Sequence, residues 1–232
     1  MPLNHVAIET GTKGKKHVAS AIAWPGWERN GKSEAEALVT LEAYRSRYAP
    51  VAEIAGLRAE FDATGGLEVV DRYVGTGTTD FWGITTRVPV SEQGKISEEE
   101  CERRIAILEA CWVFFDNVFS RVSAELRKGP RGGGRDRNEI LHHTYGTERT
   151  QWAPKVGVNT PQGAMLTPDG LRLHRQQFAD AIRTYNQEGR KARTWPLQLL
   201  LKRTCYHMLD HAWEMGDKNL SGECGSSSQE VR

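Results

Sequence analysis

Long apolar runs, a strong net charge and paired cysteines are all missing from this sequence. No segment approaches the ~18 to 20 consecutive apolar residues of a membrane-spanning helix. The first residues do not resemble a signal peptide, because no basic region is followed by an apolar one. With 31 basic and 30 acidic residues the formal net charge is +1, so no overall field attracts nucleic acid or an anionic membrane. We therefore expect a cytoplasmic protein with neither of these partners.

Cysteine is also sparse. The four cysteines, at positions 101, 111, 205 and 224, show no C-x-x-C spacing and are too few for a disulfide-stapled domain. This usage is typical of a reducing compartment. The chain of 232 residues, with 38% hydrophobic and 26% charged content, has the composition of a globular protein that is long enough to bury a core.

The first part of the chain predicts a flexible N-terminus over residues 1–15 and a small α/β module over residues 16–90. A partly alternating run at 17–24 predicts a strand that ends at Pro25-Gly26. Ser33 and Glu36 form a capping box, which predicts that a helix begins there, with Pro50 breaking or kinking it near its end. Residues 67–74 and 81–90 predict two further strands.

Residues 97–218 predict four helices, which begin near positions 97, 136, 167 and 194. The first has the strongest helical periodicity of the chain, and its apolar face is unusually broad. Such a face needs neighbours on several sides, as in a four-helix bundle. Residues 219–232, rich in Gly and Ser, predict a disordered tail. The predicted fold class is therefore α+β, with a C-terminal four-helix bundle preceded by a small α/β module.

Two histidines, His207 and His211, stand four apart in the last predicted helix, so both rings lie on one face about a turn apart. Neutral imidazole is the commonest protein metal ligand, and the pair supplies two of the three or four donors that a zinc-type site needs. If the helices alternate in direction, the start of the second helix meets the later half of the fourth. His142 or His143 would then face the pair.

At these residues the chain resembles the DinB/YfiT-like superfamily of metalloenzymes, over about residues 97–218. The segment that begins at Arg135-Asp136-Arg137 and continues through Ile140-Leu141 to His143 is similar to the second helix of actinobacterial-type members. The segment His207 to Glu214 is similar to their fourth helix. The resemblance implies a divalent metal, zinc or nickel, held by His143, His207 and His211. Members are often homodimers, so the resemblance also implies a possible second copy.

The resemblance implies metal-activated chemistry on a small-molecule substrate, with either a low-molecular-weight thiol cosubstrate or water as nucleophile. The activity would be that of a thiol transferase or isomerase, or of a hydrolase. Glu214 lies three residues after His211 on the same helix face. We predict that Glu214 is a catalytic residue, either accepting an imidazole N–H or acting as general base. Glu148, in contrast, is expected to be a solvated charge.

Three further residues are predicted to bind substrate. Arg135 and Arg137 lie in or beside the loop that precedes the second predicted helix, at the end of the bundle where the histidines would meet. There they could bind an anionic group, and Tyr145 could line a pocket. The competing hypothesis is a non-enzymatic binding protein whose metal is structural or vestigial. It predicts a metal sphere closed by a fourth protein ligand, whereas the enzyme hypothesis predicts an open position beside a cavity.

Overall fold

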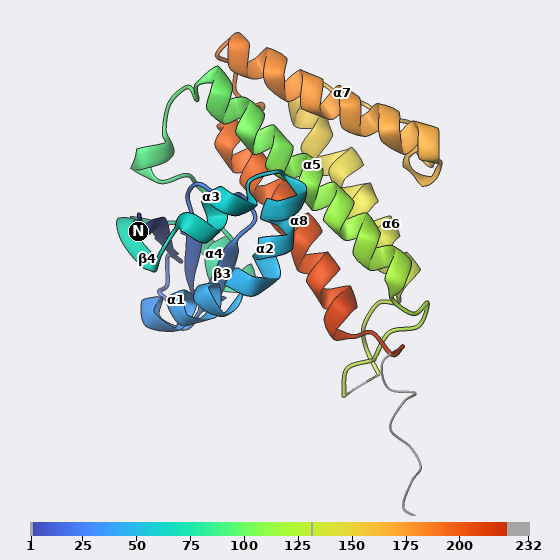
Figure 1. The fold of residues 1–232 in the computed structure, drawn as a ribbon, viewed down its shortest axis with the longest axis horizontal. Helices are drawn as coiled ribbons and strands as arrows, with labels where there is room; N and C mark the ends of the chain where they lie inside the picture. Colours follow the sequence, from blue (N-terminus) through green and yellow to red (C-terminus); the bar gives the residue numbers. More distant parts are fainter. Residues whose placement is uncertain (1, 131, 222–232) are drawn as a thin grey trace, which may run out of the picture.

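The computed structural model describes residues 2–130 and 132–221, so the predicted disordered tail falls almost entirely outside the described residues. The fold is α+β, as predicted: a four-stranded mixed sheet with its helices is followed by a region of long packed helices (Figure 1). The strands are β1 (Asn4–Thr10), β2 (His17–Ala21), β3 (Glu28–Gly31) and β4 (Leu67–Val74). The helices of this part are α1 (Glu34–Ala43), α2 (Arg45–Ile54), α3 (Arg58–Ala63) and α4 (Gly77–Trp82).

The sheet has the order β3-β2-β1-β4, in which β1 pairs antiparallel with β2 and parallel with β4. The expectation of a flexible N-terminus is wrong over Asn4–Thr10, because this segment is an inner strand. Val6 and Ile8 are buried in the core, and Gly11 donates its backbone N–H to Lys16 in the turn that leads into β2. Backbone pairing on both sides therefore orders this segment.

Two further predictions about this part need correction. The predicted break at Pro50 does not occur: the helix is interrupted at Tyr44, and Pro50 lies inside α2. The predicted strand at 81–90 is absent, since α4 occupies Gly77–Trp82. Beyond α4, the backbone N–H groups of Thr85 and Thr86 donate to buried carboxylates instead of to a neighbouring strand. Their acceptors are Glu28 and Glu9.

The four predicted long helices are present as α5 (Glu98–Arg121), α6 (Arg137–Thr147), α7 (Pro168–Gln187) and α8 (Leu197–Asp217). Ser97 accepts a hydrogen bond from the Glu100 backbone N–H at 3.1 Å, and Glu139 accepts from that of Asp136 at 2.7 Å, so the predicted caps form. A π-helix at Glu148–Trp152 and a 3₁₀ turn at Ala153–Val156 extend α6. Helix α5 packs against both α7 and α8, while α6 packs against α8 (Figure 1). No described helix is both long enough and apolar enough to cross a membrane.

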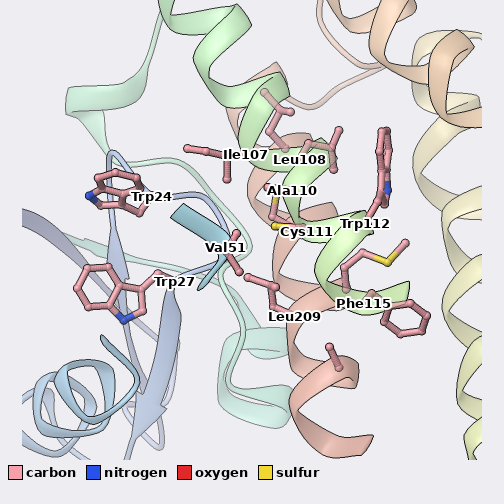
Figure 2. Close-up of a cluster of buried hydrophobic side chains, with 14 of the residues drawn as sticks. Trp24, Trp27, Val51, Ile107, Leu108, Ala110, Cys111, Trp112, Phe115 and Leu209 are labelled. Atoms are coloured by element: carbon pink, nitrogen blue, oxygen red, sulfur yellow. The ribbon is translucent and has the colours of Figure 1, made fainter. Parts of the chain in front are cut away.

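One buried cluster joins the sheet part to the long helices. Figure 2 shows Trp24 and Trp27 on one side, the side chains of α5 on the other, and Val51 of α2 between them. The two indoles pack with Phe61, at ring-centroid distances of 4.9 and 5.3 Å. The sheet part therefore packs directly against α5 and against α8, the helix that carries the histidine pair.

The turn at Gly26 packs tightly against α8. Its φ is +90°, and a Cβ atom at this position would lie 2.9 Å from both Cys205 Cβ and Leu209 Cδ1 of α8. Only glycine combines a left-handed backbone with so short a contact at low cost. The turn thus fixes the sheet part on the face of α8 that carries Cys205 and Leu209, which is roughly opposite the face with His207.

Replacing Gly26 with alanine is expected to lower the free energy of unfolding by about 2 to 4 kcal/mol, because backbone strain and a steric clash add together. Gly56→Ala is the matched control: Gly56 has a φ of +72°, but a Cβ atom at this position would meet nothing within 4 Å. Gly56→Ala should lower the free energy of unfolding by only the backbone strain, roughly 1 kcal/mol. Urea unfolding followed by circular dichroism measures both. Equal losses in the two variants would contradict the close contact with α8.

Candidate metal centre

The three predicted ligands, His143, His207 and His211, lie together in space. One ligand atom from each falls within 4.8 Å of the other two, and Nε2 of His207 is 3.3 Å from Nε2 of His143. The three ring centroids are 4.7 to 5.1 Å apart. Helix α6 contributes the first ring and α8 the other two. This cluster could bind a metal ion.

The structure also decides between the two adjacent histidines of α6. The core face of this helix carries Ile140 and Thr144, both buried, and Thr144 donates its hydroxyl to the Ile140 carbonyl. His143 is half-buried beside α8, whereas His142 is exposed. Since adjacent helical residues are about 100° apart, only one of the two can face α8, and it is His143.

Both histidines with shifted pKa values are held in the neutral form. Burial is the main reason that the pKa of His207 falls to about 2, and the neighbouring His211 and His143 lower it further. Burial also lowers the pKa of His143, followed by the charges of His211 and Arg135. Neutral imidazole is the form that binds a metal, so the surroundings favour the binding form of these two rings.

Glu214 stands behind His211 and does not join the three rings. Its Oε2 lies 2.8 Å from Nδ1 of His211, and its Oε1 accepts from Lys218 Nζ at 2.6 Å. The hydrogen bond from His211 is the main cause that lowers the pKa of Glu214 to about 2, so the carboxylate stays ionised. An anionic acceptor at Nδ1 fixes the ring and leaves Nε2 free to face the other histidines. This geometry suits a positioning residue better than a general base.

Glu214→Gln is expected to weaken zinc affinity about 10- to 100-fold, because the neutral amide orients and polarises the ring less well. Competition with a chromogenic chelator measures the affinity, and far-UV circular dichroism checks that the variant is folded. Lys218→Met is the matched control, since it removes the other partner of Glu214 but leaves the contact with His211. If Glu214→Gln binds zinc as tightly as the parent protein, Glu214 does not position His211.

The predicted substrate-binding residues fall in different places. Arg135 is exposed, and its charge contributes to the lowered pKa values of His143 and His207, so it acts on the cluster electrostatically. Arg137 donates to the Val122 carbonyl at 3.1 Å. Substrate binding by Arg135 stays a prediction. The guanidinium of Arg137 is hydrogen-bonded to the residue that follows α5.

Tyr145 is engaged away from the histidines. Its hydroxyl donates to Asp116 of α5 at 2.8 Å, and Asp116 also binds Arg175 of α7 at 2.5 Å. Only 7% of Tyr145 is exposed. The tyrosine therefore ties α6 to α5 and α7, and its hydroxyl is not free to meet a substrate.

A second polar cluster was not anticipated. Glu148 is fully buried, so its expected solvation is wrong: it accepts from Trp112 Nε1 at 2.7 Å and lies 3.1 Å from His174 Nε2. Thr160 completes the cluster at Nδ1 of His174. A buried carboxylate needs such partners. These side chains connect α5, the π-helix and α7, and they form hydrogen bonds with one another.

The three histidines of the cluster have no fourth candidate ligand in the part of the chain that the structure describes. No Asp, Glu or Cys joins the three histidines there within metal-binding distance, and each of the three rings is only partly buried. Trp152 of the π-helix lies against the cluster, with its ring centroid 6.3 Å from that of His207. A metal held by three residues keeps a position for water or another small ligand.

Comparison of the chain with protein-family models, with curated proteins and with solved structures finds no match. What the geometry itself establishes is an α+β protein with a three-histidine cluster that could bind a metal.

Proposed function

We propose that the protein is a divalent-metal-dependent enzyme of the DinB/YfiT-like kind, which activates a low-molecular-weight thiol or water for reaction with a small-molecule substrate. The observation that carries the proposal is the set of three partly exposed histidines without a fourth protein ligand among the described residues. A structural zinc site is closed by four protein ligands, whereas a catalytic one keeps a position open.

The spacing of the donors fits a metal such as zinc or nickel. Two nitrogens that are each ~2.1 Å from a tetrahedral ion lie about 3.4 Å apart, and the Nε2 atoms of His143 and His207 are 3.3 Å apart. His207 and His211 are fixed one helical turn apart, and Glu214 holds Nδ1 of His211. The nitrogens of His143 and His207 are therefore already at the separation that one ion requires.

When bound, such an ion makes a thiol or a water molecule much more acidic and so supplies a nucleophile near neutral pH. The protein's own residues provide the rest. The three imidazoles are neutral donors, so they leave the positive charge of the ion largely uncompensated. Arg135 lies where its charge already reaches the rings, and could attract an anionic substrate group. A homodimer stays a prediction.

Cobalt substitution tests the proposal, because Co²⁺ takes the same ligands as zinc and absorbs visible light. Protein loaded with one Co²⁺ should show the intense bands of a tetrahedral site, which His207→Ala should lack. Addition of N-acetylcysteine should then add a thiolate-to-cobalt band in the near ultraviolet if a thiol occupies the open position. Unchanged visible and ultraviolet spectra with thiol, together with no pH-dependent change from bound water, would refute an open reactive position.

A further inference from the structure

A cavity of about 480 Å³ lies between the sheet part and the long helices, next to the histidine cluster. One wall is formed by threonines around α4, at positions 76, 78, 85 and 86. The opposite wall is formed by the π-helix with Trp152, by Lys155, and by the loop before α8 with Arg193 and Trp195. Arg203 of α8 lies one turn before His207 and closes the inner end.

The charge of this cavity is one-sided. Its lining includes three cationic side chains, Lys155, Arg193 and Arg203, and no acidic residue among those that the structure describes. Arg203 is partly neutralised by Glu28 at 3.4 Å. Lys155 and Arg193 have no carboxylate within ion-pair distance in the described chain, and burial followed by the charge of Arg193 lowers the pKa of Lys155. The half-buried Lys155 and the exposed Arg193 thus line the same cavity without a counter-charge among the described residues.

Arg193 has an unfavourable backbone conformation. Its φ of +57° is the one positive value at a non-glycine residue in the described chain, and the left-handed region is unfavourable for such a residue. Two backbone hydrogen bonds between Ala192 and Trp195, of 2.8 and 3.1 Å, hold the turn in that shape. The same turn sets the Trp195 ring beneath Lys155, whose Nζ is 4.0 Å from the ring centroid.

One residue of the cavity wall also contacts the histidine cluster. Trp152 belongs to its wall and packs on His207, at 6.3 Å between ring centroids. The Nε1 atom of Trp152 is buried and has no acceptor among the described residues. A buried donor without a partner is uncommon in a native protein and calls for an explanation. Trp152 therefore contacts both the cavity and the histidine cluster.

We propose that this cavity binds a small anionic molecule through a carboxylate or phosphate group, with Lys155 and Arg193 as its direct partners. An arginine and a lysine that converge without a counter-charge are the groups proteins use to recognise such oxyanions. A volume of about 480 Å³ admits a metabolite of moderate size. The site stands independently of whether the histidines hold a metal.

Calorimetric titration of the full chain, stripped of metal by a chelator, tests the site with two probes, inorganic phosphate and succinate. Arg193→Gly removes the charge and suits the positive φ, so this variant should fold, and Lys155→Met removes the second charge. Each is expected to weaken binding of the preferred anion at least 10-fold. Lys191→Ala is the matched control, because Lys191 is an exposed cation of the same loop that does not line this cavity.

Binding by the parent protein that is lost in Arg193→Gly and Lys155→Met but kept in Lys191→Ala supports the proposal, and the tighter of the two probes identifies the anion class. No binding of either probe to the parent protein, or equal binding by all variants, overturns it. Because the protein is metal-free, a failure of the histidines to hold zinc does not affect the result, so the two proposals fail separately.

Discussion

Replacing His207 with alanine is expected to weaken zinc binding at least about 100-fold, more than the loss of an outer hydrogen-bond partner would. His207 contacts both other rings of the cluster: its Nε2 lies 3.3 Å from Nε2 of His143, and its ring centroid is 4.7 Å from that of His211. Removing it leaves two donors from different helices, too few for a zinc site. Chelator competition on the purified variant measures the affinity.

His142→Ala is the matched control for this prediction. His142 neighbours a ligand in the sequence and has the same side chain, yet it is exposed and outside the cluster. Zinc affinity should be unchanged in this variant and lost in His143→Ala. If His142→Ala loses as much affinity as His143→Ala, then the rings of α6 are not arranged as described.

Glu92→Gln is expected to reduce the free energy of unfolding by about 3 to 5 kcal/mol, the usual cost of removing one partner from a buried ion pair. The Glu92 side chain is only 2% exposed and pairs with Lys202 of α8 and with Arg104 of α5, the latter at 3.0 Å. The amide leaves two buried cations without a full counter-charge. Chemical denaturation of both proteins at neutral pH gives the difference.

Glu100→Gln serves as the control for this change. Glu100 also binds Arg104, at 2.6 Å, but its side chain is 32% exposed, so water compensates for the lost charge. The expected loss is about 1 kcal/mol or less. Similar losses for Glu92→Gln and Glu100→Gln would mean that Glu92 is not the buried anchor between α5 and α8.

The long helices were predictable because their signals are local. The caps at Ser97 and Asp136 and the periodic apolar residues act over one or two turns, and they define α5 and α6 within a few residues. Strand β1 was missed for the opposite reason. Its order comes from β2 and from β4, and the β4 residues that pair with it lie some sixty residues away, whereas sequence patterns report only neighbouring residues.

The false strand at 81–90 shows the same limit. Its apolar and β-branched residues match a strand pattern, but the backbone amides of Thr85 and Thr86 are bound by Glu28 and Glu9. The buried carboxylates of Glu28 in β3 and Glu9 in β1 accept the hydrogen bonds that a partner strand would otherwise accept. No local feature of residues 81–90 signals that competition.

The candidate metal centre was predictable to a different degree for each residue. The spacing of His207 and His211 places both on one face of a helix, so their proximity follows from helical geometry alone. His143 needed the resemblance and the packing of α6 on α8 to be chosen over His142. The burial of Glu148 was not foreseeable, because it depends on partners in α5 and α7, Trp112 and His174.

X-ray absorption spectroscopy at the zinc edge, on the full chain loaded with one zinc ion and freed of excess metal, is the sharpest test of the three-histidine centre. We expect three imidazole ligands at ~2.0 to 2.1 Å and one further oxygen from solvent. Zinc that does not stay bound, or a shell with fewer than three imidazoles or with a fourth ligand from the protein, would contradict an open three-histidine metal centre.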